Sequence, residues 1–127
     1  LQRTMNSAGW VDWELWEGFI RLKGITIDRP LHSVHPQYEE IVYPIDYGYV
    51  NSTVSADGEE QDIFVGTANN GLVGAIFTED HQKSDRECKL IYDCSPKEIY
   101  LVNGFINFLP NLMHGRLLMR YLMKDLW

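Results

Sequence analysis

Two groups of acidic residues carry the side chains of this sequence that are best suited to chemistry. The first lies in YPIDYGYVNSTVSADGEEQD, residues 43–62, and includes Asp57, Glu59 and Asp62. The second lies in TEDHQKSDRECK, residues 78–89. Carboxylates packed together repel one another, and protons or bound cations relieve the repulsion. Oxygen ligands of this kind suit Mg²⁺, so the two groups predict a divalent-cation site if the fold brings them together.

The spacing within each group supports a shared site. Asp85 and Glu87 alternate by two, so their side chains point the same way on an extended chain, and Lys89 follows on that face. Asp57 and Glu59 are spaced in the same way. If the two segments become neighbouring strands, four or more carboxylates and one lysine line a single cavity.

Each feature also has a simpler interpretation as solvated surface. Asp57-Gly58 is a hairpin-turn signal whose flanking acids can face water. Residues 85–89 can be the solvent-exposed beginning of a strand. The sequence lacks the D-x-D-x-D-G order of a helix–loop–helix calcium loop. His32 and His35 have no further ligand placed to complete a zinc site, and we interpret them as loop histidines.

Composition excludes several classes of function. The net charge of −7 argues against nucleic-acid binding, and residues 30–82 contain no Lys or Arg at all. The sequence contains neither an apolar run of membrane-spanning length nor a signal segment, so we expect no membrane association. Cys88 and Cys94 are too few for a disulfide framework, and two reduced thiols predict a cytoplasmic protein.

The elements that must position these side chains follow from apolar patterning. The pattern predicts an amphipathic helix at 10–22 and a second helix that Ser95-Pro96 opens and that runs to about 109. The tail 117–127 is either strand or helix. The strands are expected at 24–30, 39–44, 47–54, 61–67, 72–78 and 88–93.

Short strands between terminal helices predict an α+β, mainly β fold. We expect a small OB-like closed β-barrel of about five strands with flanking N- and C-terminal helices. The chain is expected to form a single domain, 1–127, with 1–23 as an N-terminal helical extension.

The string ITIDRPLHSVHPQYEEIVYPIDYGYVNSTVSADGEEQD resembles the soluble, family I inorganic pyrophosphatases, especially a small bacterial branch. That branch carries a DRPxGSxHP element, then YPxxYGY, then an acidic DG turn that ends in Asp. The resemblance runs from about Ile25 to Lys89 and continues more weakly to Arg120. YPIDYGYV followed at this distance by DGxxxD is its most specific part.

The resemblance implies a role for individual residues. Asp57 and Asp62 match metal-binding aspartates, and Asp62 would bridge the ions and the attacking water. Glu59 stands where the classical enzymes have Asp. Lys89 and Tyr47 match phosphate-contacting residues. The further candidate metal ligands that the resemblance implies are Asp85, Glu87 and Asp80.

The same comparison shows where the phosphate-binding half is reduced. His32 stands in place of the Gly of PxGS, and Val34 and Gln37 leave that loop without a basic residue. An arginine expected before the YP motif is missing. The Tyr-Lys pair that holds product phosphate near the C-terminus is absent, and His114 would substitute for its lysine.

These observations predict Mg²⁺-dependent hydrolysis of inorganic pyrophosphate to two phosphates by metal-activated water. Two or more Mg²⁺ ions are expected, with Mn²⁺ as an option, in a cytoplasmic homo-oligomer that binds a small-molecule substrate. One alternative is a catalytically degenerate homologue that acts as a metal/phosphate or nucleotide-binding module. Another is a hydrolase of a larger diphosphate compound.

Overall fold

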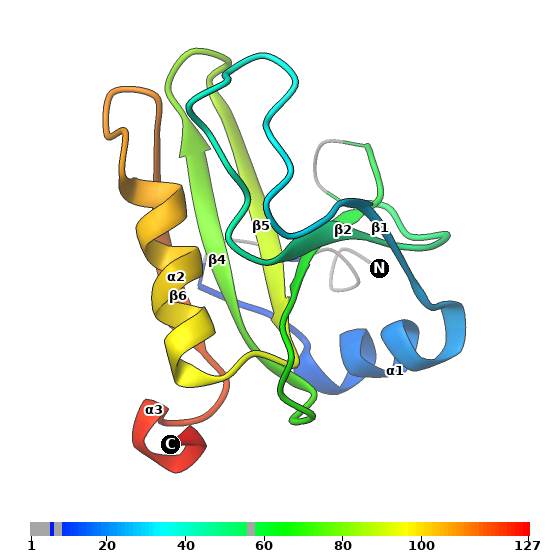
Figure 1. Cartoon of the computed structure of the whole chain (residues 1–127). Helices are drawn as coiled ribbons and strands as arrows, with labels where there is room; N and C mark the ends of the chain where they lie inside the picture. The colour runs from blue at the N-terminus through cyan, green and yellow to red at the C-terminus, as the bar shows by residue number, and fades with distance from the viewer. Residues whose placement is uncertain (1–5, 7–8, 56–57) are drawn as a thin grey trace.

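A six-stranded mixed sheet with helices on both faces forms the fold (Figure 1). The computed structural model describes residues 6, 9–55 and 58–127. The strands follow the order β1-β2-β3-β5-β4-β6; β3 and β5 are parallel and the other neighbours antiparallel. The elements are α1 (Trp13–Lys23), β1 (Ile25–Arg29), β2 (Asp46–Val50), β3 (Gln61–Val65), β4 (Leu72–Asp80), β5 (Asp85–Tyr92), α2 (Pro96–Asn107), β6 (Met113–Met119) and α3 (Met123–Leu126).

The prediction of an α+β, mainly β fold is confirmed, but the prediction of a closed barrel is wrong. Within the described residues, β1 and β6 are the two edges of an open sheet. The reason lies in the central strands: β4 along most of its length and β5 in residues 88–91 are buried on both faces. Strands of that kind are covered by other elements on each side, whereas a small barrel turns one face toward solvent.

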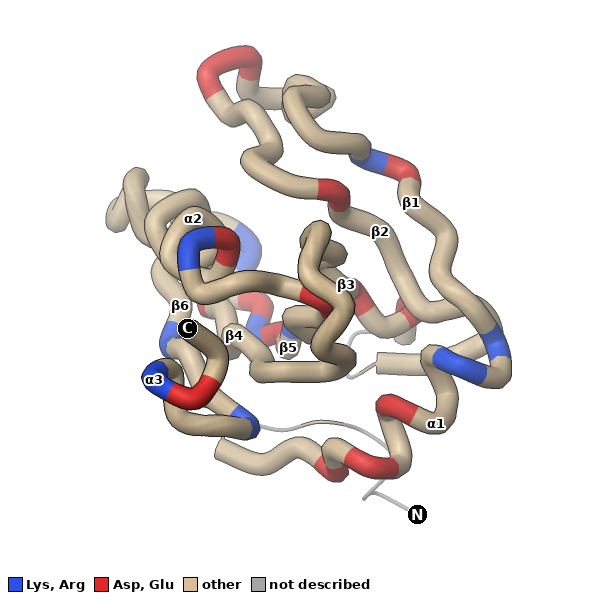
Figure 2. Tube along the Cα trace, turned by 60° about the horizontal axis from the view of Figure 1, so that its bottom comes forward, with Lys and Arg blue, Asp and Glu red and all other residues tan. Residues whose placement is uncertain are grey.

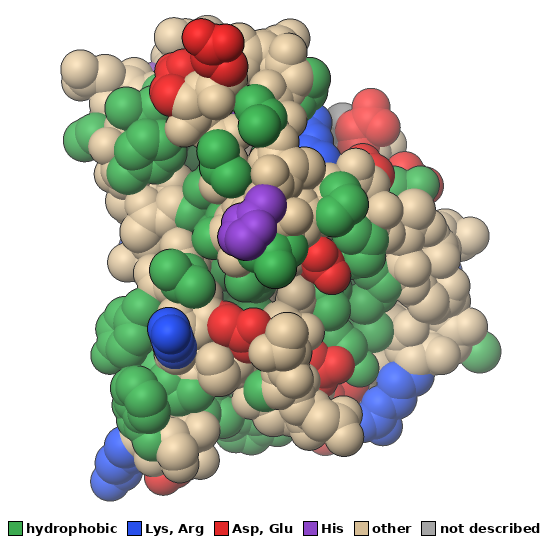
Figure 3. Space-filling view, in the orientation of Figure 1, with side chains coloured by type: hydrophobic (Ala, Val, Ile, Leu, Met, Phe, Trp, Pro, Cys, Tyr) green, Lys and Arg blue, Asp and Glu red, His purple; other side chains and the backbone are tan. Residues whose placement is uncertain are grey.

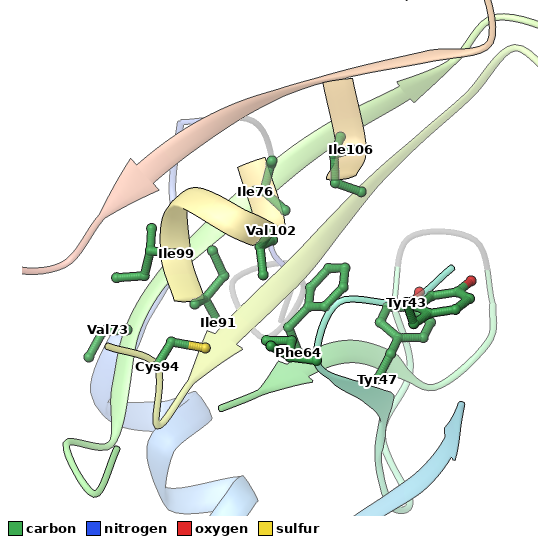
Figure 4. Packing of buried hydrophobic residues seen from close by; sticks show 11 residues of the cluster. Tyr43, Tyr47, Phe64, Val73, Ile76, Ile91, Cys94, Ile99, Val102 and Ile106 are labelled. Atoms are coloured by element: carbon green, nitrogen blue, oxygen red, sulfur yellow. The ribbon is translucent and has the colours of Figure 1, made fainter. Parts of the chain in front are cut away.

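The two longer helices, α1 and α2, bury the two faces of the sheet. Trp16 and Ile20 of α1 pack with Ile63 and Leu90 on one face. On the other face, α2 contributes a buried stripe at three- and four-residue spacing. That stripe packs with Phe64, Ile76 and Ile91, and two tyrosines extend the cluster at one end (Figure 4). The aromatic end of this α2-side cluster borders a cavity.

Local sequence signals explain both helix starts. Asp12 caps α1 by accepting from the Leu15 amide at 3.2 Å. Ser95 and Glu98 form a reciprocal capping box at the start of α2, with Pro96 in the first turn. None of the described helices is long and apolar enough to cross a membrane.

One predicted strand is absent from the structure, and two further segments take a form that the sequence left open. Residues 39–44, predicted as a strand, are irregular and contribute an isolated bridge between Val34 and Val42. The tail is strand and then helix, because β6 completes the edge beside β4 before α3 begins. The β2–β3 hairpin forms, but its connection is ten residues long, 51–60. Asp57 of the predicted turn lies outside the described residues.

Candidate functional site

A cavity of about 320 Å³ opens beside the aromatic end of the α2-side core. Strands β1, β2, β3 and β5 form its polar side. The end of α2 and the segment after it form an apolar side. In Figure 3 a histidine lies among hydrophobic side chains at the centre of one face of the molecule, and acidic side chains lie around it. The cavity therefore combines charged and apolar walls.

Lys89 is the central polar residue of this cavity. Its side chain is 10% exposed, and its Nζ donates three hydrogen bonds. The acceptors are Tyr47 Oη at 2.8 Å, Asp62 Oδ2 at 3.1 Å and Glu87 Oε1 at 3.1 Å. Such an ammonium has all three protons engaged.

Strand pairing explains why these residues meet. The parallel register pairs Ile63 with Leu90, which makes Asp62 and Lys89 neighbours across β3 and β5. Tyr49 lies directly opposite Asp62 on β2, and Tyr47 is two residues away on the same face. The site is thus assembled from three strands that are distant in sequence.

Burial and charge perturb the acid–base behaviour of the group. Burial alone would lower the pKa of Lys89, but Tyr47, Asp62 and Glu87 more than offset this and hold it well above its ordinary value. Burial raises the pKa of Tyr47, with a further contribution from Asp62 that Lys89 opposes, so the phenol is neutral near pH 7. Burial also raises the pKa of Glu87; Lys89 opposes the shift and the adjacent Asp62 adds to it. Asp62 and Glu87 therefore repel each other across one lysine.

Negative charge exceeds positive charge around the cavity. The tube in Figure 2 shows adjoining acidic and basic positions on β1, which are Asp28 and Arg29. Among the described residues, five carboxylates face three cationic side chains: Asp28, Glu59, Asp62, Asp80 and Glu87 against Arg29, Lys83 and Lys89. The excess of two negative charges matches one divalent cation, and carboxylate oxygens are the ligands that Mg²⁺ prefers.

Arg29 adds a positive charge to the cavity wall, and the sequence did not identify it as a site residue. Its guanidinium donates to the Tyr43 hydroxyl and lies 5.4 Å from the centre of the Tyr43 ring and 6.0 Å from that of Tyr47. His35 stacks against Tyr43 at 6.3 Å. Burial, Arg29 and Lys83 together lower the pKa of His35, so this imidazole adds little positive charge. The sequence signal that could have identified Arg29 is the basic residue of the DRP segment, because the strand that carries this segment pairs with the strand that carries YPxxYGY.

The structure brings together only part of the predicted site. Tyr47, Asp62, Glu87, Lys89, Glu59 and Asp80 all line the cavity. Asp80 also accepts from the Gln82 and Lys83 amides at 3.0 Å each, which closes the turn after β4.

Asp85 and His114 lie elsewhere. Asp85 is an exposed residue at the start of β5, opposite Asp80, and is not among the cavity-lining residues that the structure describes. His114 pairs with Glu79, whose neighbour on β5 is Arg86. Because Arg86 precedes Glu87, this set points to the face of the sheet opposite the cavity.

No protein-family model matches this chain, and a search of curated proteins finds no match either.

Proposed function

We propose that this protein is a Mg²⁺-dependent hydrolase that cleaves inorganic pyrophosphate into two phosphates, and that it belongs to the family I inorganic pyrophosphatases. The observation that carries the proposal is Lys89, buried on the cavity wall and bonded to Tyr47, Asp62 and Glu87. The phenol of Tyr47 can donate to phosphate, the ammonium of Lys89 attracts phosphate electrostatically, and the excess of carboxylates beside them supplies cation ligands.

The carboxylates fit the metal that such a reaction requires. Asp62, Glu87 and Glu59 would hold Mg²⁺, with Asp80 and Asp28 at the cavity wall. When bound, Mg²⁺ neutralises the diphosphate and lowers the pKa of a coordinated water.

The chain's own residues then act on charge and orientation. The carboxylate of Asp62 orients the attacking water and receives its proton as the new P–O bond forms and the bridging P–O bond breaks. Lys89 stabilises charge on the departing phosphate. Tyr47 Oη accepts from Lys89, so its own proton remains to be donated to a phosphate oxygen. Positioning and charge stabilisation dominate phosphoryl transfer, and this arrangement provides both.

Arg29 and Lys83 strengthen the proposal because they supply positive charge that the sequence interpretation lacked. Both line the cavity, Arg29 from β1 and Lys83 from the turn after β4. Arg29 lies on the edge strand β1, three places from β5 in the strand order, whereas Lys83 lies in the turn that joins β4 to β5. A dianionic or tetra-anionic substrate can therefore be contacted by cationic groups at more than one end.

The test is phosphate release from pyrophosphate in Mg²⁺ and in EDTA, with Asp62→Asn compared with Asp125→Asn. Asp125 is exposed on α3, so its variant is a matched removal of one carboxylate away from the cavity. We expect Asp62→Asn to lose at least about a hundredfold in turnover while the fold is retained, and Asp125→Asn to match the wild type. Near-normal turnover by Asp62→Asn would refute the assignment.

The apolar side of the cavity favours a second candidate, hydrolysis of a diphosphate that carries an organic group. Pyrophosphate has no apolar part, yet Ile41, Phe105, Phe108 and Leu109 line the same cavity. Phe108 is 49% exposed, so Phe108→Ala should leave the fold intact. A selective loss of activity on nucleoside diphosphates, with pyrophosphate turnover unchanged, supports this candidate. Magnesium binding without turnover of either substrate would instead indicate a binding module.

A further inference from the structure

Glu79, His81 and His114 form a separate cluster on the other face of the sheet. Glu79 on β4 lies directly opposite His114 on β6, and residues opposite each other in an antiparallel pair share a face. His81 is two residues beyond Glu79, and its amide donates to the Leu112 carbonyl at 2.9 Å, which extends the pairing past the end of β4. All three side chains therefore emerge on the side away from Glu87 and Lys89.

The contacts within this cluster are close. His81 Nε2 lies 2.7 Å from His114 Nδ1, and the two rings stack with centroids 4.8 Å apart. Glu79 Oε1 lies 3.9 Å from His114 Nε2. One ligand atom from each of the three residues lies within 4.8 Å of the others. Arg86 Nε donates to Glu79 Oε2 at 2.8 Å, and this bond holds the carboxylate in place.

We propose that Glu79, His81 and His114 bind a late first-row transition-metal ion, for which Zn²⁺ is the test ion. Two imidazoles and one carboxylate are a borderline donor set that suits zinc, whereas the oxygen-only cavity suits magnesium. Three protein ligands leave a position of a tetrahedral ion open to water.

The cluster needs little rearrangement to bind the ion. The short contact between two ring nitrogens requires one N–H between them, and a metal replaces that proton and accepts both lone pairs. Zinc–nitrogen bonds of about 2.0–2.1 Å place two tetrahedral ligands roughly 3.3 Å apart, so the rings separate by about 0.6 Å. Both histidines are exposed, and small side-chain rotations provide this distance.

The site also links two elements mechanically. Because β6 is an edge strand, an ion held by Glu79, His81 and His114 ties the end of β4 to the start of that edge. The proposal is independent of pyrophosphate hydrolysis, since the cluster lies on the face opposite the cavity and uses none of its lining residues.

The experiment is titration of the full chain with Zn²⁺ against a chromophoric chelator, with millimolar Mg²⁺ present so that the acidic cavity is occupied. We compare His81→Gln and His114→Gln with the control His32→Gln. His32 is exposed in the loop after β1 and is not a member of the cluster. Circular dichroism of each variant verifies that the fold is retained.

We expect one bound Zn²⁺ per chain, with affinity reduced at least about tenfold in His81→Gln and in His114→Gln and unchanged in His32→Gln. Zinc should also raise the thermal midpoint of the wild type and of His32→Gln, but not of the two cluster variants. Two results would overturn the proposal: no stoichiometric Zn²⁺ binding by the wild type, or an equal loss of affinity in all three variants.

Discussion

Replacing Lys89 with Met should destabilise the protein while leaving its shape almost unchanged. Methionine fills most of the volume of the lysine stem, so the main loss is one buried positive charge. Removing one partner of a fully buried ion pair costs about 3–5 kcal/mol. The side chains of Asp62 and Glu87 remain 27% and 25% exposed, which lets water solvate them in part. We therefore expect Lys89→Met to lower the free energy of unfolding by about 2–3 kcal/mol.

Urea unfolding in EDTA measures this loss, with fluorescence from the buried Trp16 and the other tryptophans as the signal. With a slope of about 1.5 kcal/mol per molar urea, the midpoint of Lys89→Met falls by about 1.3–2 M. The control is Lys97→Met, which removes an exposed charge at the start of α2 and should change stability by less than about 0.5 kcal/mol.

Magnesium provides the second half of the experiment. In Lys89→Met, Asp62 and Glu87 lose the charge that separates them, so a divalent cation should stabilise the variant more than the wild type. The midpoint difference should therefore narrow in millimolar Mg²⁺. A variant as stable as Lys97→Met would show that Lys89 does not offset the two carboxylates. A difference unchanged by Mg²⁺ would contradict their assignment as cation ligands.

Three further predictions concern the scaffold. Burial would raise the pKa of Glu17, but hydrogen bonds from the Leu72 amide and from Arg120 lower it below 4.5. The ionised carboxylate therefore stabilises the fold fully above pH 4.5, and this stabilisation is lost as the pH falls through the pKa of the folded state. Glu17→Gln should therefore cost about 1–2 kcal/mol near pH 7 in urea unfolding, and the difference from wild type should shrink below pH 4.5. Ser95→Ala removes the cap of α2 and should lower the free energy of unfolding by about 1 kcal/mol, a result that an unchanged thermal midpoint would contradict. Gly48→Ala would place a Cβ 1.8 Å from a backbone oxygen of β1 and should abolish stable folding, whereas Gly104→Ala meets nothing within 4 Å. The Gly104 variant should gain about 0.5–1 kcal/mol, and equal midpoints for the two alanine variants would refute this steric argument.

Most of the individual elements follow from local sequence. The Ser95-Pro96-Lys97-Glu98 start predicts α2 because the capping bonds are formed by residues within one turn. The apolar runs 61–67 and 72–78 predict β3 and β4 for a similar reason. For residues 39–44 local composition predicts the wrong structure. They have the composition of a strand, yet they lie in a loop beside the cavity and pair through a single bridge.

The sheet topology was the main error, and its cause is physical. Local patterning shows that β4 and β5 are apolar, but not which elements cover their two faces. The parallel pairing of β3 with β5 joins segments with β4 between them in sequence, and it opens the sheet instead of closing a barrel.

By itself, the sequence determined the chemical inventory of the protein: clustered carboxylates, Tyr47, Lys89 and a long segment without positive charge. Only the tertiary structure decided which of these groups meet. It brought Arg29 to the cavity and turned His114 to the opposite face, beside His81. The physical reason is that side-chain direction depends on strand register, and a shift of one residue moves a side chain from one face of a sheet to the other.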